Sequence, residues 1–419
     1  MVKRFVLILV LFAQVSAGFD GQLAAQLKGM PTNDQITLLE SKLKNKPNDL
    51  QLETLLARAL LQRLRETMDP VYLQKAASVV DRMQSQDAKN YEALRLQNAI
   101  DLQRHNFPKV AERAADLLKR NPSDAGTTGV LGDCRMEMGE YDEAGKLYRH
   151  MVELSPDMTS YNRLAYQLFV TGKTQEAVNW MYQAALAGSK SSENDAWVYT
   201  EFGDLLYKTG RTADAKEAYL RALKDFPGYH RANAAMGRFL ANQGDFTGAL
   251  VYLKRAQASV PLPDYAALLA AVYDKTGDKK GAADQESLID AINTLMIANH
   301  ETMNRNLALI FADENRKLDR ALTLAKAEFT VRNDVFTYDA YGWVLYKLKR
   351  NSEALEAARK AISLGTPDPT LHYHAGMIAW DSGDRDMARA ELKRALDLNP
   401  KFDFRFDEQA ADVLRQLNP

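Results

Sequence analysis

Histidine and cysteine are scarce in this sequence, and their spacing suits neither catalysis nor metal binding. Six histidines are scattered along the 419 residues, and His372 and His374 are the one close pair. Residues two apart on a helix point to different faces, whereas shared metal ligation from one helix usually needs a separation of four. No metal site is therefore expected. The single Cys134 lies in an apolar stretch, which favours a buried thiol over a reactive or dimer-forming one.

The usual motifs of enzyme active sites do not occur in the sequence. It has no phosphate-cradling glycine loop, no nucleophile elbow and no zinc-protease helix motif. Acidic groups such as Glu140, Asp142 and Glu143 lie where helices are expected to start, and negative charge there suits the helix dipole. We interpret them as capping residues, not as acid and base pairs. The sequence therefore predicts neither an enzyme nor a bound cofactor.

The first residues are typical of a secretory signal peptide. Lys3 and Arg4 precede a short apolar run, and Val15, Ser16 and Ala17 form a small-residue cleavage site. The apolar run is far shorter than the roughly 20 residues that span a bilayer, which disfavours an uncleaved anchor. Residues 1–17 are predicted to be removed after Ala17. The mature chain is then expected in the periplasm or outside a bacterial cell, with no integral membrane span.

Charge and cysteine content restrict the partners and the compartment. Cleavage removes two of the 54 basic residues and none of the 55 acidic ones, which leaves 52 against 55 and a net charge of −3. A pI near 6.6 disfavours nucleic-acid binding, which needs a basic surface. One cysteine cannot form an internal disulfide, and no Asn-x-Ser/Thr acceptor occurs. Both observations fit a bacterial envelope protein.

An alanine recurs along the chain at spacings of 33 to 39 residues, which indicates an internal repeat. The recurring positions are Ala77, Ala111, Ala144, Ala177, Ala215, Ala249, Ala282, Ala321, Ala354 and Ala388. Five residues before many of them stands Gly139, Gly172, Gly210, Gly244, Gly277 or Gly383, with Asn106 in an earlier copy. Gly and, less readily, Asn adopt the left-handed conformation that ends a helix. Each unit is therefore predicted to be helix, turn, helix.

The unit from Ala196 to Tyr229 shows which helix faces should meet. The predicted core face of its first helix carries Tyr199, Phe202, Gly203 and Leu206. The matching face of its second helix carries Ala215, Tyr219 and Ala222. Small residues at Gly203 and Ala215 let the two helices approach closely, while Tyr219 and Phe202 fill the space beside them.

This pattern resembles the tetratricopeptide-repeat family. In that family the first helix of each unit carries a bulky, an apolar, a small and a bulky residue, and the second carries two small residues around an aromatic or aliphatic one. The resemblance covers residues 48–401 as about ten units. It implies an all-α, right-handed superhelical solenoid. Three segments depart from the pattern, namely a long turn over Arg65–Pro70, added residues over Gly188–Asn194, and a prolonged second helix or loop through His300.

Both ends of the array are predicted to be caps with a polar outer face. The N-terminal capping segment is residues 18–47, with a helix over Thr32–Leu43, and the C-terminal one is residues 402–419, with a helix over Asp407–Leu417. Phe402, Phe404 and Phe406 alternate with charged residues. We favour packing for them over a short strand or a docking peptide.

The resemblance also implies that first helices line a concave, ligand-holding surface. Two aromatic clusters fall beside the core stripe there. The principal one is Phe336, Asp339, Trp343, Tyr346, Tyr373 and Trp380, and the other is Tyr166, Phe169, Trp197 and Tyr207. Middle units offer small or charged residues such as Arg231, Arg238 and Asp264. Because Trp and Tyr dominate interface hot spots, we predict that the clusters bind a partner. Packing between neighbouring first helices is the alternative.

The sequence thus predicts a non-enzymatic scaffold of the bacterial envelope or secreted space that holds partner proteins or peptides. Glycan binding by the same aromatic face, as in a polysaccharide-export accessory protein, is the alternative function. Sugar sites need carboxylates and amides beside each ring, and only Asp339 and Asp381 lie near the C-terminal cluster.

Overall fold

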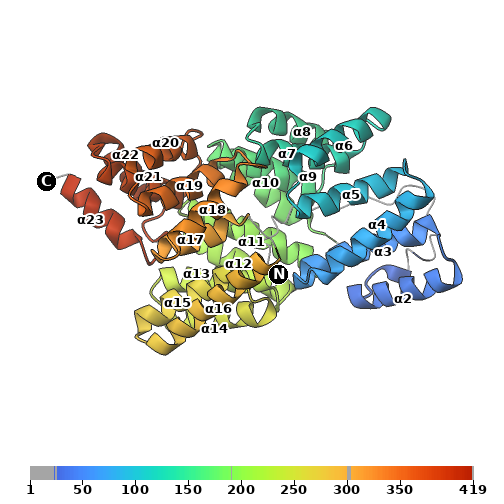
Figure 1. Ribbon diagram of the computed structural model, residues 1–419, viewed down its shortest axis with the longest axis horizontal. Coiled ribbons are helices and arrows are strands. Elements are labelled where there is room, and N and C mark those ends of the chain that lie inside the picture. The colour runs from blue at the N-terminus through green and yellow to red at the C-terminus, as the bar shows by residue number, and fades with distance from the viewer. Residues whose placement is uncertain (1–22, 24–25, 190, 300–302, 418–419) are drawn as a thin grey trace. The chain divides into compact units, whose positions relative to one another are not determined.

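The computed structural model describes residues 23, 26–189, 191–299 and 303–417, so the predicted signal peptide lies outside the described residues. The described residues form 22 α-helices and no strand (Figure 1), which confirms the all-α prediction. A first helix, α2 (Thr32–Asn45), and a last helix, α23 (Asp407–Leu417), flank ten helix pairs. The two flanking helices are the ones expected at the caps.

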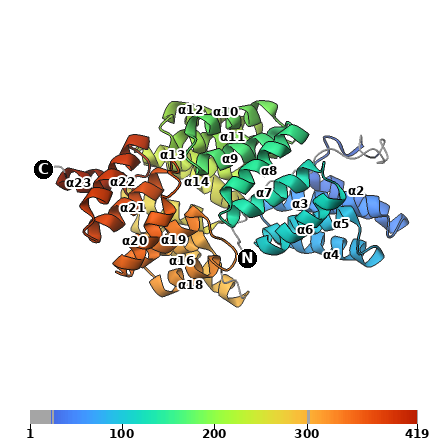
Figure 2. The same ribbon diagram turned by 90° about the horizontal axis from the view of Figure 1, so that it is seen from above.

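Each pair consists of a first and a second helix joined by a short turn (Figure 2). The first five pairs are α3 (Leu50–Thr67) with α4 (Val71–Gln86), α5 (Tyr91–Gln103) with α6 (Phe107–Arg120), α7 (Ala125–Glu137) with α8 (Tyr141–Leu154), α9 (Met158–Val170) with α10 (Thr174–Ala187), and α11 (Ser192–Lys208) with α12 (Thr212–Asp225). The other five are α13 (His230–Asn242) with α14 (Phe246–Ser259), α15 (Pro263–Thr276) with α16 (Lys279–Ala298), α17 (Arg305–Asp313) with α18 (Leu318–Glu328), α19 (Val335–Lys347) with α20 (Asn351–Ala361), and α21 (Pro369–Asp381) with α22 (Arg385–Leu398).

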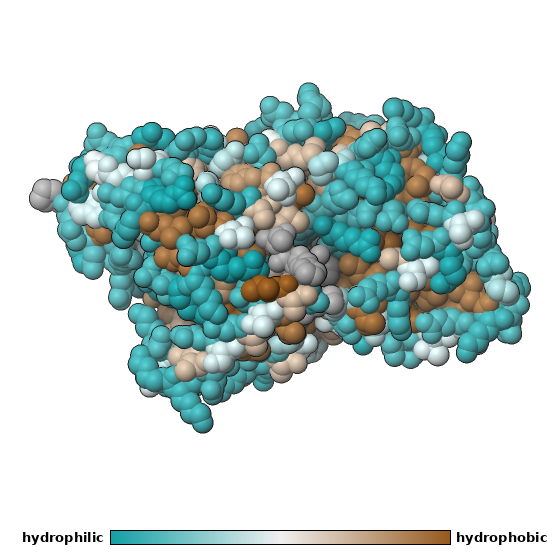
Figure 3. Space-filling view, in the orientation of Figure 1, coloured by the Kyte–Doolittle hydropathy of each residue, from teal (hydrophilic) through white to brown (hydrophobic). Residues whose placement is uncertain are grey.

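The described residues divide into two compact units. The N-terminal unit runs to Arg163 and also includes Ser189 and Ser191, and the C-terminal unit comprises residues 164–188 and 192–417. Each unit has hydrophobic cores of its own, built mainly from alanine and leucine on the helix faces that meet. On the face shown in Figure 3, hydrophilic residues predominate and hydrophobic ones form separate patches.

The turns between paired helices follow the predicted glycine pattern, with one shift. The six predicted glycines have φ between 77° and 84°, the left-handed conformation that ends a helix. In the second repeat, however, His105 takes this conformation with φ 59°, and Asn106 precedes α6 with φ −90°. The prediction for Asn106 is therefore wrong by one residue. Consequently Val110, not Ala111, lies three residues into α6, where later repeats have their alanine.

Close approach of the paired helices depends on glycine packed against a tyrosine ring. A Cβ atom at Gly203 would lie 2.4 Å from Cε1 of Tyr219, and one at Gly132 would lie 2.5 Å from Cε1 of Tyr148. Each tyrosine hydroxyl donates to the aspartate that follows the glycine, Asp204 at 2.8 Å and Asp133 at 2.9 Å. The predicted close contact at Gly203 is confirmed, and the facing residue is Tyr219.

The same two aspartates tie each repeat to the next. Asp204 accepts a hydrogen bond from Arg238 of α13 at 2.6 Å, and Asp133 accepts one from Arg163 Nε at 2.9 Å. Each carboxylate therefore joins three helices, two of its own repeat and the first helix of the following one. Burial alone would lower the pKa of Arg238, but Asp204 offsets that effect and raises it, so the guanidinium stays charged.

The three irregular segments differ from expectation in length. Helix α3 continues through Arg65 to Thr67 and ends at Met68, whose φ of 55° is left-handed, so the turn is shorter than predicted. The packed alanine of that repeat is accordingly Ala76, whereas Ala77 is half-buried. Helix α11 starts at Ser192 and has 17 residues, against 13 in α13. Helix α16 extends for 20 residues to Ala298, which favours the prolonged-helix alternative.

Candidate functional site

Repeats far apart in the sequence meet inside the C-terminal unit, along a contact that we call the seam. It consists of residues 362–368 and 399–406, which precede α21 and α23 and lie against the ends of α9, α11 and α13. Thr366 Oγ1 donates to the carbonyl oxygen of Val170 at 2.6 Å, and Asn399 Nδ2 donates to that of Tyr207 at 2.8 Å. The seam therefore joins the first repeats of this unit to the last ones.

Lys208 is the charged centre of the seam. Its Nζ atom lies 2.8 Å from Asp368 Oδ2, and 5.4 Å and 6.0 Å from the ring centroids of Phe169 and Phe336. Burial raises the pKa of Asp368, but Lys208 outweighs burial and the net pKa is lowered. Burial likewise lowers the pKa of Lys208, and Asp368 reverses this, so its net pKa is raised. Both groups are thus charged at neutral pH.

Asn242 binds the backbone of the 399–406 segment through its carboxamide group. Its Nδ2 donates to the carbonyl oxygen of Phe402 at 3.0 Å, and its Oδ1 accepts from the Phe404 amide at 3.1 Å. The ring of Phe404 packs edge-on against Phe246, with centroids 5.7 Å apart. Phe402, Phe404 and Phe406 are all buried, so the packing prediction for them is confirmed. A side-chain amide thereby holds the backbone of a turn on these helices.

The predicted C-terminal aromatic cluster lies largely in the core. Trp343 is 1% exposed, its Nε1 donates to Asp313 at 2.8 Å, and its ring stacks on His374 at 4.0 Å. Tyr373 is also 1% exposed and stacks on Phe406 at 5.1 Å. Tyr346 is buried against Trp343 at 5.0 Å. These rings therefore pack against their own chain, because the 399–406 segment and α23 cover the inner side of the last two repeats.

Other members of that cluster are also engaged within the chain. Asp339 is buried and its Oδ1 lies 2.9 Å from His374 Nδ1. Phe336 is half-buried between the cations of Lys208 and Arg305. Trp380 is half-buried under the guanidinium of Arg385, 3.8 Å from its ring centroid. No ring of this cluster stands open with a carboxylate beside it, which is the arrangement that the glycan alternative requires.

The second predicted cluster is split between the seam, the core and the surface. Phe169 and Tyr207 are buried in the seam, where the Tyr207 hydroxyl donates to the carbonyl oxygen of Lys401. Trp197 is buried, and Tyr166 is 40% exposed. Phe169 and Phe336, from the two clusters, meet at Lys208. The residues that hold the seam were not predicted, because single polar residues such as Lys208, Asp368 and Asn242 leave no periodic signal in the sequence.

Helices α11 and α13 are the first helices of successive repeats, and one side of each carries a ladder of charged side chains. We call this side the inner face. It comprises Trp197, Glu201, Asp204 and Lys208 of α11 with Arg231 and Arg238 of α13. Arg231 Nη2 lies 2.5 Å from Glu201 Oε1, and Arg238 Nη2 lies 2.6 Å from Asp204 Oδ1. The four side chains are between 25% and 35% exposed. The inner face therefore offers paired but accessible charges of both signs.

Buried donors lie beside this ladder. The indole Nε1 of Trp197 and the hydroxyl of Tyr229 have no hydrogen-bond partner within the described residues, although both side chains are buried. An unpaired buried donor costs free energy, so an acceptor placed there would be favoured. Burial, with a smaller contribution from Arg231, lowers the pKa of neighbouring His230 to about 3. His230 is therefore neutral at physiological pH, with Nδ1 2.7 Å from the Tyr265 hydroxyl.

The histidine and cysteine side chains have structural contacts. His372 Nδ1 lies 2.6 Å from Glu391 Oε2, on a different helix face from His374. Cys134 is buried as predicted, and burial raises the pKa of its thiol. The described part of the chain has no group of three or more His, Cys, Asp or Glu residues placed to hold a metal ion. Nor does it have a helix whose length and apolar content would let it cross a membrane.

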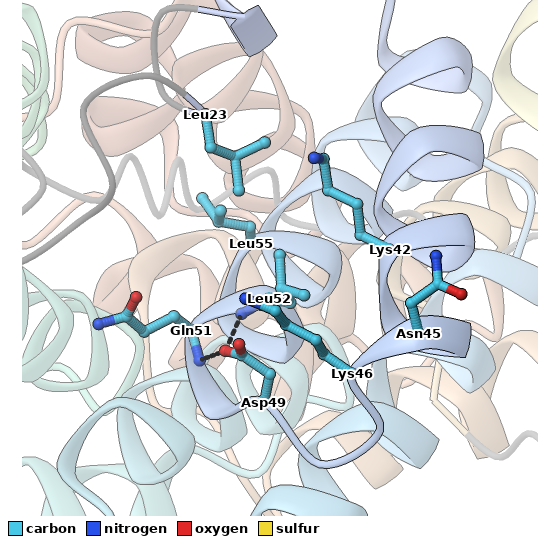
Figure 4. Close-up of a pocket in the computed structure, with 8 residues that line it drawn as sticks. All are labelled: Leu23, Lys42, Asn45, Lys46, Asp49, Gln51, Leu52 and Leu55. Atoms are coloured by element: carbon cyan, nitrogen blue, oxygen red, sulfur yellow. Dashed lines mark hydrogen bonds between the residues drawn. The ribbon is translucent and has the colours of Figure 1, made fainter.

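A separate hollow of about 290 Å³ lies in the N-terminal unit between α2 and α3 (Figure 4). The Asp49 carboxylate at its edge caps α3, accepting hydrogen bonds from the Gln51 and Leu52 amides at 3.0 Å and 3.1 Å. Lys46 and Asn45 are exposed surface residues. Because its one acidic group is already used by α3, this hollow is a weaker candidate site than the inner face.

Replacing Lys208 tests whether the seam stabilises the C-terminal unit. Lys208→Met leaves the buried Asp368 carboxylate without its cation, and we expect the free energy of unfolding to fall by about 1–3 kcal/mol. The folded-state pKa of Asp368 is lowered from 3.8, so the pair stabilises above that pH and its contribution is lost as the pH falls further. Urea unfolding should therefore separate variant and parent at neutral pH and bring them together in acid.

A matched control for this variant is Lys146→Met, which breaks an exposed pair with Glu143 at 2.7 Å. Because both groups are fully exposed to solvent, we expect that change to leave the free energy of unfolding close to the parental value. Equal stability of Lys208→Met and its parent at neutral pH would show that the Lys208–Asp368 pair of the seam contributes nothing.

Comparison with known families agrees with the helix pairs and their spacing. A tetratricopeptide-repeat model matches residues 96–159 and 200–262, and a second one matches residues 369–402. The chain therefore contains tetratricopeptide repeats over these residues. Its repeat fold is that of a protein-interaction scaffold. No curated protein matches the sequence.

Several solved structures have a similar arrangement of helices at low sequence identity. One is a chain of the APC/C hetero-tetramer Cut9–Hcn1, with 15% identity and a TM-score of 0.45, and the match covers 92% of this chain and 58% of that one. Another is PilW, described as a widely conserved type IV pilus biogenesis factor, with 16% identity, a TM-score of 0.42, and coverage of 48% and 92%. A third is PilF of Pseudomonas aeruginosa, with 17% identity, a TM-score of 0.42, and coverage of 48% and 91%.

Proposed function

We propose that this protein is an exported, non-enzymatic scaffold of the bacterial envelope that holds a segment of a partner protein by its backbone along the inner face of α11 and α13. The observation that carries the proposal is the pair of hydrogen bonds in which Asn242 donates to the Phe402 carbonyl oxygen and accepts from the Phe404 amide. This contact binds peptide backbone atoms and does not depend on the identity of the bound side chains. The four accessible charges, Glu201, Asp204, Arg231 and Arg238, lie on the same two helices.

The ladder gives such a segment additional contacts. Arg231 and Arg238 have donors that can bind partner carbonyl or carboxylate oxygens, and Glu201 and Asp204 can accept from amides. Burial lowers the pKa of Arg231, but Glu201 reverses this and the net pKa is raised, so the guanidinium stays charged. The buried Trp197 and Tyr229 donors lie beside this route. The location in the envelope rests on the signal-peptide pattern of residues 1–17.

The proposal is tested by exchanging the charges of one inner pair. The double change Glu201→Arg with Arg231→Glu keeps an ion pair but exchanges which helix carries the positive charge and which the negative one. We expect a tagged chain recovered from its native host to lose its partner by about thirtyfold or more, as at an interface hot spot. The exported chain should begin at Gly18 by mass spectrometry.

The control exchanges the exposed pair of the N-terminal unit, Glu143→Lys with Lys146→Glu, and should retain the partner. Thermal melts of both double variants should match the parent. Undiminished partner recovery with the inner exchange would overturn the inner-face proposal, and an intact Met1 in a cytosolic fraction would overturn export.

A further inference from the structure

The outer side of α10, α11 and α12 contains a pocket of about 420 Å³, which we call the outer pocket. Its apolar lining comes from Val178 and Tyr182 of α10, Tyr199, Phe202 and Leu206 of α11, and Ala218 of α12. Its volume is in the range of ligand pockets, about 300–1,000 Å³. The lining residues of α11 recur at i, i+3 and i+7, about half a turn from the inner-face residues, so the two sites lie on opposite sides of one helix.

Two residues that the repeat pattern assigns to the core remain partly accessible in this pocket. Tyr199 and Phe202 were predicted to be in the core, but both are half-buried. Their equivalents one repeat later, Asn233 and Met236, are each 1% exposed. The core prediction is therefore wrong for these two rings, because α10 and α12 leave a gap above them. The gap lies at the repeat where the link before α11 departs from the usual spacing.

Exposed apolar side chains extend the pocket along α10. Tyr182 is 48% exposed, with its ring 5.9 Å from that of Phe202, and Leu186 is exposed one turn further along α10. An apolar strip of this kind between two helices is the surface that an amphipathic helix occupies in helix-in-groove recognition.

The rim of the outer pocket has one uncompensated charge. Arg211 pairs with Asp214 at 2.7 Å, and Arg221 pairs with Asp225 at 3.1 Å and lies over the Tyr199 ring. Glu217 is exposed and forms no ion pair with any described residue. A partner that covers the apolar floor would therefore gain by placing a cation beside Glu217.

We propose that the outer pocket binds an amphipathic helix of a partner protein. That helix places an aromatic or branched apolar side chain over the Tyr182 and Phe202 rings and a lysine or arginine at Glu217. This surface is separate from the inner face, so the two sides of α11 allow the scaffold to hold two partners at once.

The test uses the full mature chain and a labelled synthetic helical peptide of about 18 residues, long enough to be partly helical in water. The peptide carries tryptophan and leucine four positions apart and lysine one turn from the tryptophan, and a second peptide has glutamate in place of lysine. Fluorescence anisotropy should give a Kd for the lysine peptide below about 100 μM. Tyr182→Ser should raise that Kd about tenfold or more.

Charge exchange tests the orientation of the peptide. Glu217→Lys should weaken the lysine peptide by about fivefold and reverse the preference between the two peptides. Glu112→Lys makes the same charge change at an exposed side chain of α6 in the N-terminal unit, and it should leave both affinities unchanged. The double change Glu201→Arg with Arg231→Glu should also leave both peptide affinities unchanged. This separates the peptide result from the test of the proposed function.

Three results would overturn the proposal. One is binding weaker than about 1 mM for both peptides. Another is an affinity that Tyr182→Ser does not change while the melting temperature stays at the parental value. The third is self-association of the parent chain that Tyr182→Ser abolishes in sedimentation measurements, which would assign the pocket to a second copy of this chain.

Discussion

A Gly203→Leu variant should have a free energy of unfolding about 1–3 kcal/mol below that of the parent, as expected for overpacking a filled core. A Cβ atom at this position would lie 2.4 Å from Cε1 and 2.6 Å from Cδ1 of Tyr219, so the ring must move. Moving the ring also breaks the bond from its hydroxyl to Asp204, which accepts from Arg238 of the next repeat. Urea unfolding followed by circular dichroism measures the loss.

Gly228 supplies the matched control for this change. A Cβ atom at Gly228 would meet no heavy atom within 4 Å, so Gly228→Ala should leave stability unchanged while Gly203→Ala lowers it. Because the seam joins distant repeats, the loss at Gly203 should spread through the C-terminal unit and not remain local. A Gly203→Leu variant as stable as its parent would contradict the packing described here.

Trp343→Ala should cost about 3–5 kcal/mol of stability, the usual effect of truncating a large buried side chain. The side chain is 1% exposed, stacks on His374 and donates to Asp313. Removing it leaves a cavity between α19 and α21 and leaves the Asp313 acceptor without this donor. A thermal melt combined with partner recovery separates this role from that of a binding anchor.

Trp380→Ala is the comparison variant, because that side chain is half-buried under Arg385. It should cost about 1 kcal/mol, the typical effect of a single substitution outside the core. An unchanged melt of Trp343→Ala with diminished partner recovery would show that Trp343 acts as an anchor after all.

Local spacing predicted most of the fold, because it records contacts between neighbouring helices. The positions of Gly203 and Tyr219 depend only on their own repeat, and both could be placed from the sequence. The packing of Trp343 and Tyr373 could not, because it depends on Phe406 and on a segment that follows α22. Likewise, the accessibility of Tyr199 and Phe202 depends on the spacing of α10 and α12. Periodicity does not record either arrangement.

Arg231 and Arg238 of the inner face were identified in the sequence as charged positions, but their pairing with Glu201 and Asp204 was not predicted. Glu201 and Arg231 lie in successive first helices, and their separation in space depends on how those helices stack. Asn242 gives even less signal, because one amide at the end of a helix resembles any helix-terminal residue. Its role appears only when residues 160 and 162 positions away are brought against it.

The seam also has a consequence for how the chain folds. In most helical-repeat proteins each unit touches only its neighbours, so folding can proceed one repeat at a time. Here Val170 and Thr366 are 196 positions apart, and Tyr207 and Asn399 are 192 apart. Contacts between residues so far apart in the sequence form late and slow the folding reaction. The C-terminal unit can therefore complete its structure only after residues 399–406 have been synthesised, and a shortened chain that lacks them leaves the ends of α11 and α13 uncovered.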